Sequence, residues 1–296
     1  MNYPGLSSRG DTKKTDPSLK KAAKSGSLRK IPLFTRQIKI LSKLFSHLKR
    51  LNKNGWHANC YLLGQGTIIM SRLRALGVDI SHWQGYPDFK KMKKAGASFV
   101  YIKASQNLWP DQSFQYNWKA AKEAGLLRGA YHFYDMRDGS DTPKHQAEFF
   151  ANLLSSDPGE LLPAMDFECP GIAGYPDYPA HDQSDKIVRQ FAEKVQKILG
   201  HLPILYTNLA GINHLDPLTE LVRSMDLWIA WYNLKSHYPK YGVWPNWRIW
   251  QYKSTGDGIA FGVESKGLDM DAFNGTVDDL YDYANSLGLS KRTLTR

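Results

Sequence analysis

From Gly77 to the end of the chain, short β-rich runs alternate with helix-like segments, and this alternation constrains the fold more than any other feature. The β-rich runs are 78–81, 99–104, 129–134, 162–168, 203–207, 227–231, 248–252 and 267–270. The helix-like segments are 88–95, 113–124, 144–154 and 184–199. Gly96, Gly125 and Gly200 each follow one of these segments, where glycine commonly ends a helix.

Strands that alternate with helices predict βαβ units, a parallel sheet and right-handed crossovers. Eight strands within about 210 residues fit a (β/α) barrel. The later strands, however, are separated by segments with little helical pattern. We therefore predict an α/β fold, an irregular TIM-like barrel of about eight strands and five main helices, over residues 77–290.

The composition excludes several other classes of protein. Hydrophobic residues make up 42% of the chain and aromatic residues 12%, which is too apolar for a disordered protein. Two cysteines allow one disulfide at most and form no secreted disulfide framework. The sequence has no run of about 18 apolar residues that would span a membrane, and residues 1–30 lack the apolar stretch of a secretory signal.

The formal charge of +11 is concentrated near the N-terminus. Residues 1–76 hold 16 Lys and Arg residues against only Asp11 and Asp16, whereas the other 220 residues hold 23 basic and 26 acidic residues. We predict a disordered cationic tail over 1–30, followed by a basic amphipathic helix and a linker over 31–76. Met70 precedes the first strand, so a shorter product could begin there.

The basic helix has three alternative roles. Apolar residues recur at helical spacing through 31–53, namely Phe34, Ile38, Leu41, Phe45 and Leu48. Such a helix could pack on the barrel or have no specific role, or it could bind an anionic envelope surface through residues 31–53. Nucleic acid is not expected as a partner, because no known motif accompanies the charge.

Polar side chains gather at the ends of the predicted strands. They are Asp79, Lys103, Ser105, His132, Tyr134, Asp166, Glu168, Tyr206, Asn208, Trp231, Tyr232, Gln251 and Asp269. In (β/α) barrels the strand ends meet at one mouth, which carries the chemistry. Four carboxylates are therefore expected to converge there.

Asp166 and Glu168 are the strongest candidates for catalysis. They lie two residues apart at the end of an apolar run, so both side chains are expected on one side of the strand. Repulsion between neighbouring carboxylates raises one pKa, and a protonated acid beside a carboxylate suits glycoside hydrolysis. A D-x-E pair alone is weak evidence, since it also occurs by chance and in magnesium sites.

Aromatic residues near the strand ends favour a sugar as the substrate over a metal site. They are Trp83, Tyr131, Phe133, Tyr134, Tyr206, Trp228, Trp231, Tyr232, Trp250 and Tyr252. Flat rings stack on sugar faces, although about half of these residues would serve the core of a barrel instead.

Nine short motifs follow one another through the second part of the chain. They are GVDISHWQG (77–85), FVYIKAS (99–105), QYNWKAAKEAGLLRGAYHFY (115–134), QAEFF (146–150), PAMDFE (163–168), PILYTN (203–208), LWIAWY (227–232), WRIWQY (247–252) and GLDMDAFNG (267–275). In these motifs and in their order, the sequence resembles the glycoside hydrolase family 25 lysozymes, the muramidases of bacteria and bacteriophages. The resemblance covers residues 77–287, about 70% of the chain.

The resemblance implies cleavage of the β-1,4 bond between N-acetylmuramic acid and N-acetylglucosamine in peptidoglycan. It implies Glu168 as the catalytic acid and Asp166 as its partner, with Asp79 and Asp269 completing an acidic pocket. It implies that the substrate is bound by Tyr131, His132, Tyr206, Trp231 and Gln251, and we add Lys103 as an orienting or ion-paired group. We expect neither a metal nor a cofactor.

Two segments depart from the family's pattern. The second strand is followed by Gln106 and Asn107, where the family usually has a sequence like IKATEG, and residues 170–182 look like an insertion that could form a lid. Neither departure removes a carboxylate, so we expect activity.

The sequence leaves the mechanism and one rival function open. Inversion needs the carboxyl groups about 6.5–9.5 Å apart and retention about 5 Å, while the substrate's N-acetyl group could instead be the nucleophile, oriented by Asp166. We slightly favour this last route. The rival is a catalytically silent glycan-binding or virion structural protein on the same barrel.

We expect a monomer that acts on peptidoglycan glycan strands in the cell wall, in the periplasm or outside the cell. A phage or prophage origin, with release through a partner pore, would fit a muramidase without a signal sequence.

Overall fold

A computed structural model describes residues 74–137, 140–171, 175–215, 219–232, 244–289 and residue 294. The predicted tail over 1–30 and the predicted basic helix within 31–73 lie outside the described residues.

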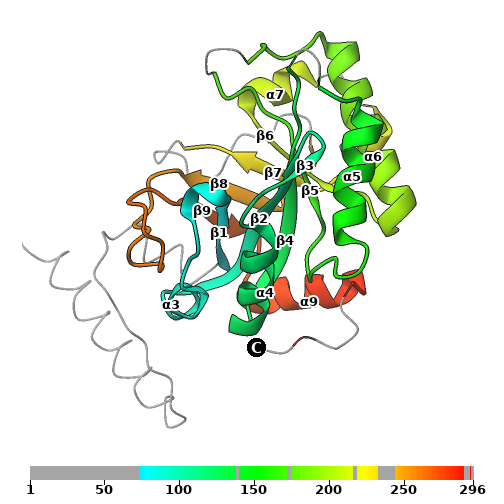
Figure 1. The fold of residues 1–296 in the computed structure, drawn as a ribbon. Coiled ribbons are helices and arrows are strands. Elements are labelled where there is room, and N and C mark those ends of the chain that lie inside the picture. The colour runs from blue at the N-terminus through cyan, green and yellow to red at the C-terminus, as the bar shows by residue number, and fades with distance from the viewer. Residues whose placement is uncertain are drawn as a thin grey trace, which may run out of the picture. The chain divides into compact units, whose positions relative to one another are not determined.

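Eight strands form a closed barrel (Figure 1). In chain order they are β1 (Leu76–Ile80), β2 (Ala97–Gln106), β4 (Leu127–Phe133), β5 (Ala164–Asp166), β6 (Ile204–Asn208), β7 (Leu227–Ala230), β8 (Ile249–Lys253) and β9 (Asp269–Phe273). The sheet closes because β1 pairs with β2 on one side and with β9 on the other. Each predicted run overlaps one of these strands, so the predicted barrel is confirmed. A short β3 (Trp109–Pro110), which was not predicted, forms a hairpin with the end of β2.

The last strand differs from the prediction of a parallel sheet. β9 runs antiparallel to both β1 and β8, with Asp269 opposite Asp79. The start of β9 therefore lies beside the carboxyl end of β1. Asp269 was expected at the mouth as the end of a parallel strand, but it reaches the mouth because its strand is reversed.

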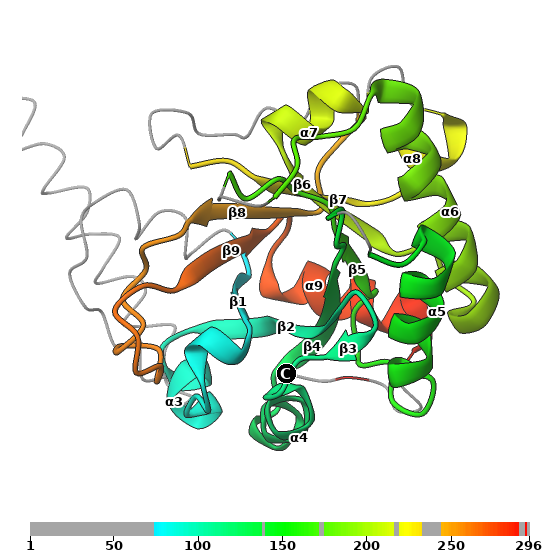
Figure 2. The ribbon, with the colours of Figure 1, turned by 45° about the horizontal axis from the view of Figure 1, so that its top comes forward.

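Helices cover the outside of the barrel, and the four predicted helical segments are confirmed. They are α3 (Phe89–Lys94), α4 (Phe114–Ala124), α5 (Pro143–Leu154) and α6 (His181–Leu199). Figures 1 and 2 show α5 and α6 side by side along one flank. α4 and α6 end at Gly125 and Gly200 with φ of 73° and 83°, a left-handed conformation that glycine adopts without strain.

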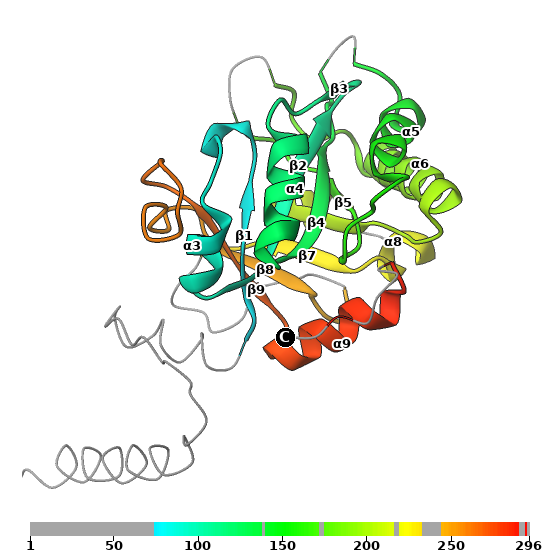
Figure 3. The ribbon, with the colours of Figure 1, turned by 60° about the horizontal axis from the view of Figure 1, so that its bottom comes forward.

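Four further helical elements had no individual prediction. They are the 3-10 helix η2 (His82–Gln84), α7 (Leu209–His214), α8 (Glu220–Ser224) and α9 (Val277–Leu287). Figure 3 shows α9 across the end of the barrel opposite β3, where Leu280 and Ala284 pack into the same apolar cluster as the barrel interior. No helix within the described ranges is both long enough and apolar enough to cross a membrane.

Large aromatic side chains fill the barrel interior. Tyr101 and Trp228 lie with ring centroids 4.6 Å apart, and the Tyr101 hydroxyl donates to the carbonyl of Leu162 at 3.0 Å. Gly129 makes this packing possible, because a Cβ there would lie 2.2 Å from the Tyr101 ring. The barrel is therefore a packed core with a solid floor rather than an open pore.

A fully buried arginine ties β4 to the segment before β5. The Arg128 guanidinium donates to both carboxylate oxygens of Glu160, at 2.9 and 2.8 Å, and to both of Asp157, each at 3.0 Å. It also lies over the Trp118 ring, 4.3 Å from the centroid. Its charge is thus matched by hydrogen bonds, as a buried ion requires.

Replacement of Arg128 should strongly destabilise the fold. We expect Arg128→Met to lower the free energy of unfolding by about 3–5 kcal/mol, because Glu160, which is only 12% exposed, loses the partner that compensates its charge. Lys122→Met is the matched control, since Lys122 also pairs with Asp157 but is 58% exposed, and it should cost less than about 1 kcal/mol. Urea unfolding followed by tryptophan fluorescence measures both, and similar losses in the two variants would contradict this account.

Candidate active site

The mouth of the barrel holds a cavity of about 290 Å³. It is lined by Asp79, Ile80, Ser81, Trp83, Gln84, Lys103, Tyr131, Phe133, Asp166, Glu168, Tyr206, Trp228, Tyr232, Gln251 and Asp269. Eight of the ten predicted site residues are among them, namely Asp79, Lys103, Tyr131, Asp166, Glu168, Tyr206, Gln251 and Asp269. The four carboxylates expected at the mouth therefore share one cavity.

His132 does not line this cavity, contrary to the prediction. Its neighbours Tyr131 and Phe133 point inward, so the two-residue period of the strand turns His132 outward, where it packs against Phe150 and Phe191. Burial lowers the pKa of His132 to about 4, so the imidazole is neutral near pH 7.

Two hydrogen bonds fix the tautomer of His132. Nε2 lies 3.0 Å from Oε1 of Gln146, an acceptor, and Nδ1 lies 2.8 Å from the Ser105 hydroxyl. Nε2 therefore carries the hydrogen and Nδ1 accepts from Ser105. Both ring nitrogens are satisfied within the layer between strands and helices, which is a structural role.

The prediction also placed Trp231 in the cavity, whereas the two-residue period of the strand turns it outward. It is half-buried against the apolar layer outside the barrel, while Trp228 and Tyr232 line the cavity. Tyr232, which is 50% exposed, occupies the position at the mouth that we had assigned to Trp231.

The two candidate catalytic residues lie at the end of β5, where Asp166 is buried and Glu168 is half-buried. Burial, followed by the charge of Asp269, raises the pKa of Glu168 to about 7. Burial and the charge of Glu168 raise the pKa of Asp166 well above its usual range. Oδ1 of Asp166 is buried and accepts no hydrogen bond from the described residues. The pair can thus hold a proton near neutral pH and present an unpaired oxygen.

Lys103 contributes a positive charge to this cavity. Nζ donates to Oε1 of Gln106 at 2.9 Å and lies 4.7 Å from the centroid of the Phe133 ring. Its charge lowers the pKa values of Asp166 and Glu168, opposing the effect of burial. Burial in turn lowers the pKa of Lys103 itself. Lys103 therefore balances the carboxylates without forming a close ion pair with either.

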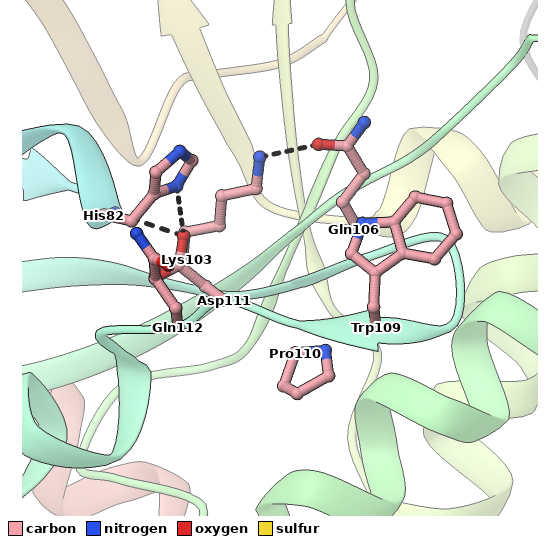
Figure 4. A pocket seen from close by; sticks show the side chains of 7 residues that line it. All are labelled: His82, Lys103, Gln106, Trp109, Pro110, Asp111 and Gln112. Atoms are coloured by element: carbon pink, nitrogen blue, oxygen red, sulfur yellow. Dashed lines mark hydrogen bonds and ion pairs between the residues drawn. The ribbon is translucent and has the colours of Figure 1, made fainter.

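A second pocket, of about 230 Å³, adjoins the cavity and shares Lys103 with it (Figure 4). It is lined by His82, Lys103, Gln106, Trp109, Pro110, Asp111 and Gln112. Nδ1 of His82 lies 2.7 Å from Oδ2 of Asp111, and Trp109 is 50% exposed. Gln106, one of the residues that depart from the family's pattern, is the partner of Lys103 in this pocket.

The insertion-like segment 170–182 contacts both pockets through Tyr175. The Tyr175 ring meets Phe133 edge-on, with centroids 5.7 Å apart, and its hydroxyl accepts from Nε2 of Gln106 at 3.4 Å. Tyr178 anchors the same segment by donating to Oδ1 of Asn208 at 3.2 Å. The described part of the segment thus packs behind residues that line the two pockets.

A polar network connects several residues that line the cavity, and sequence reasoning missed part of it. The hydroxyls of Tyr206 and Tyr232 donate to Oε1 of Gln251, at 2.9 and 2.5 Å, and Nε2 of Gln251 donates to Oδ2 of Asp79 at 2.7 Å. Asp271 extends this network from within the barrel. The D-x-D spacing of Asp269 and Asp271 was visible, but only the position of β9 shows that both face inward.

The carboxyl groups of β1 and β9 also have raised pKa values. Burial raises the pKa of Asp269 to about 6 and that of Asp271 to about 8. Burial and the charges of both aspartates raise the pKa of Asp79 well above its usual range. Within the described ranges, no three His, Cys, Asp or Glu side chains come together as metal ligands.

A (β/α) barrel whose mouth combines a protonatable carboxyl, a neighbouring carboxylate and exposed aromatic rings has the equipment of a glycoside hydrolase. The sequence profile of Glycosyl hydrolases family 25 matches residues 78–259. The chain belongs to this family.

Relatives and solved structures support the same assignment. Lysozyme M1 of Streptomyces globisporus is 29% identical over 222 residues, covering 71% of each chain. An autolytic lysozyme of Clostridium acetobutylicum is 32% identical over 202 residues, which cover 67% of this chain and 55% of the relative. The structure of a bacterial lysozyme from Streptomyces coelicolor superimposes with a TM-score of 0.61 at 28% identity, covering 72% of this chain and 97% of that one.

The raised pKa values predict that the fold loses stability as the pH rises. A buried acid with a raised folded-state pKa binds its proton more tightly when folded, so its contribution is present at low pH and is lost through the folded-state pKa. Between about pH 6.5 and 8.5, ionisation of Glu168 and Asp271 should lower the free energy of unfolding by about 1–3 kcal/mol. The effect of His132 has the opposite sign and is mostly complete at the lower end of this range, because it ends just above the unfolded-state pKa of 6.5.

Urea unfolding at the two pH values measures this loss. Glu168→Gln should reduce the difference, because glutamine does not titrate. Equal stability of the original protein at both pH values would contradict the assigned pKa shifts.

Proposed function

We propose that the protein is a muramidase, which hydrolyses the β-1,4 bond between N-acetylmuramic acid and N-acetylglucosamine in peptidoglycan and so lyses cell walls. The observation that carries the proposal is the position of Glu168, whose carboxyl has a pKa of about 7 and lies beside Asp166 in the acidic cavity. Family membership and the lysozyme relatives support the choice of substrate.

Glu168 acts as the general acid in this proposal. A carboxyl that holds its proton near neutral pH can protonate the glycosidic oxygen as the bond breaks. Asp269, which is paired with Asp79 on the neighbouring strand, raises the pKa of Glu168 through its charge. The negative charge of the cavity also stabilises the positive charge that develops on the sugar.

Asp166 assists the attack on the sugar. Its unpartnered Oδ1 is suited to accept the N–H of the substrate's N-acetyl group and so to direct the acetyl oxygen toward the anomeric carbon. This supports the substrate-assisted route over a nucleophilic attack by Asp166 itself. Water then opens the resulting intermediate, with Glu168 now acting as the base.

Aromatic rings provide the surface for the sugar rings. Trp83 is 77% exposed and Tyr232 50% exposed, and both line the cavity. The exposed ring of Trp109 extends the aromatic surface into the adjoining pocket (Figure 4). Rigid exposed rings offer large contact areas at little entropic cost, which suits a polymeric glycan.

Glu168→Gln should abolish the release of reducing ends from purified peptidoglycan and leave binding nearly intact. Glutamine fills the same space but cannot donate the proton, and loss of a general acid costs about 10²–10⁴-fold in rate. The matched control is Glu123→Gln, because Glu123 has a side chain that is 64% exposed on α4.

Reducing-end assays and co-sedimentation with insoluble peptidoglycan measure the two properties. Unchanged hydrolysis by Glu168→Gln would overturn the assignment of the acid. Absence of hydrolysis by the original protein, with binding retained, would favour the rival function of a glycan-binding or virion protein.

The proposal extends to the basic N-terminal segment and the site of action. The enzyme acts on cell walls outside the cytoplasm, and residues 31–53 attach it to an anionic envelope surface. The excess of basic residues in 1–76 supports this part, because cationic amphipathic helices bind anionic lipid surfaces. A prophage origin with release through a pore would account for its delivery.

Removal of residues 1–69 should separate the hydrolysis of purified peptidoglycan from the lysis of intact cells. A protein that begins at Met70 should hydrolyse purified peptidoglycan at the same rate as the full chain, because the barrel holds the whole cavity. It should lyse intact cells with an outer membrane less well. Turbidity and reducing-end assays measure these rates, and equal activity of both proteins on both substrates would exclude an envelope role for the segment.

A further inference from the structure

Asp271 lies directly beneath the cavity and has no role in the mechanism above. On β9 it is opposite Gly77 of β1 and Gln251 of β8. Its side chain is fully buried and does not line the cavity. The next inward-facing residue of β1 is Asp79, so Asp271 and Asp79 are diagonal neighbours across the two paired strands.

The hydrogen bonds of this aspartate leave one oxygen to be explained. Oδ1 of Asp271 accepts from Nε1 of Trp228 at 2.9 Å, whereas Oδ2 is buried and receives no donor from the described residues. The carboxyl of Asp79, two residues beyond Gly77 on the adjoining strand, is placed to form a hydrogen bond with this oxygen. Two carboxylates cannot form such a bond, because neither has a hydrogen to donate. One of the two groups therefore carries a proton.

The charges around the pair favour the same conclusion. The titratable groups that face it are Asp269 on β9, Tyr101 on β2, Tyr131 on β4, Tyr206 on β6, Tyr232 after β7 and Tyr252 on β8. None of these is a cation. Two ionised carboxylates in this buried setting would repel each other without compensation, which agrees with the raised pKa values of both groups.

We propose that Asp79 and Asp271 share one proton, and that Asp271 is a positioning residue that holds Asp79 in place within a pair of single negative charge. The pair titrates as a unit, so the proton belongs to both groups. The effect on hydrolysis rests on the proposed function, whereas the shared proton itself does not.

The shared proton also orients the tyrosines at the mouth. A charged Asp79 accepts from Nε2 of Gln251, so the amide must turn Oε1 toward the hydroxyls of Tyr206 and Tyr232. Both hydroxyls donate to this oxygen, which leaves their lone pairs as acceptors for the donors of a bound sugar. Through Asp79 and Gln251, Asp271 thus determines that the two tyrosine hydroxyls act as hydrogen-bond acceptors toward a bound sugar.

Two substitutions of Asp271 distinguish the effect of the shared proton from the effect of side-chain size. In Asp271→Asn, the amide oxygen can accept from Trp228 and the amide nitrogen can donate to Asp79, so the arrangement persists with a permanent donor. Asp271→Leu has a similar size but offers neither group. Asp282→Asn is the matched control, because Asp282 is exposed on α9.

The first test follows the aspartate carboxyl carbons of the free protein by NMR with ¹³C-labelled aspartate. We expect a titration above about pH 7 that belongs to the pair. It should be lost in Asp271→Asn and kept in Asp282→Asn. A spectrum of Asp271→Asn with every high-pH titration of the original protein would overturn the shared proton, whatever the protein's substrate is.

The second test compares the hydrolysis of peptidoglycan at about pH 6, where the pair holds its proton. We expect Asp271→Asn to keep kcat within about threefold, and Asp271→Leu to lose about ten- to hundredfold, as is typical when a supporting hydrogen-bond partner is removed. Near-UV circular dichroism shows whether the Leu variant is folded. A loss in Asp271→Asn as large as that of Glu168→Gln would overturn the positioning role, because the shape and the donor are kept there.

Discussion

The reversed direction of β9 is the constraint on which the site depends. Seven parallel strands leave a gap between β1 and β8, and an antiparallel strand closes it with its first residue at the mouth. The register places Asp269 opposite Asp79 and turns Asp271 inward one pair below. A slip of one residue would turn both β9 acids out toward the helices. Barrel closure and the acidity of the cavity therefore depend on the same pairing.

Burial creates the chemistry of this cavity and also lowers the stability of the barrel. The low dielectric that brings the pKa of Glu168 to about 7 penalises every carboxylate around it. The rest of the barrel compensates through a dense floor of aromatic rings around Tyr101 and Trp228 and through the satisfied ion pairs of Arg128. The interactions that stabilise the barrel thus lie below the mouth, away from the carboxyl groups that line the cavity.

Two outer segments of the chain meet near Lys103. The β2–β3 hairpin and the segment that carries Tyr175 both meet Gln106, the partner of Lys103. Because Lys103 belongs to both pockets and also lowers the pKa of Glu168, changes in these outer segments can alter the pKa of Glu168, the proposed general acid. Such changes can act without any substitution among the carboxylates.

Local sequence determined the elements and most of the site, and the tertiary structure decided which side chains face the cavity. Residues close together in the sequence set the composition of each strand and the glycines that end helices. These features, like the order of the motifs, could therefore be predicted from the sequence. The inward or outward direction of a side chain depends on strand register and bulges, which long-range pairing sets. For this reason His132 and Trp231 were wrongly placed at the mouth. The role of Asp271 could not be seen until β9 lay beside β1, because its proton depends on a carboxylate almost two hundred residues away in the chain.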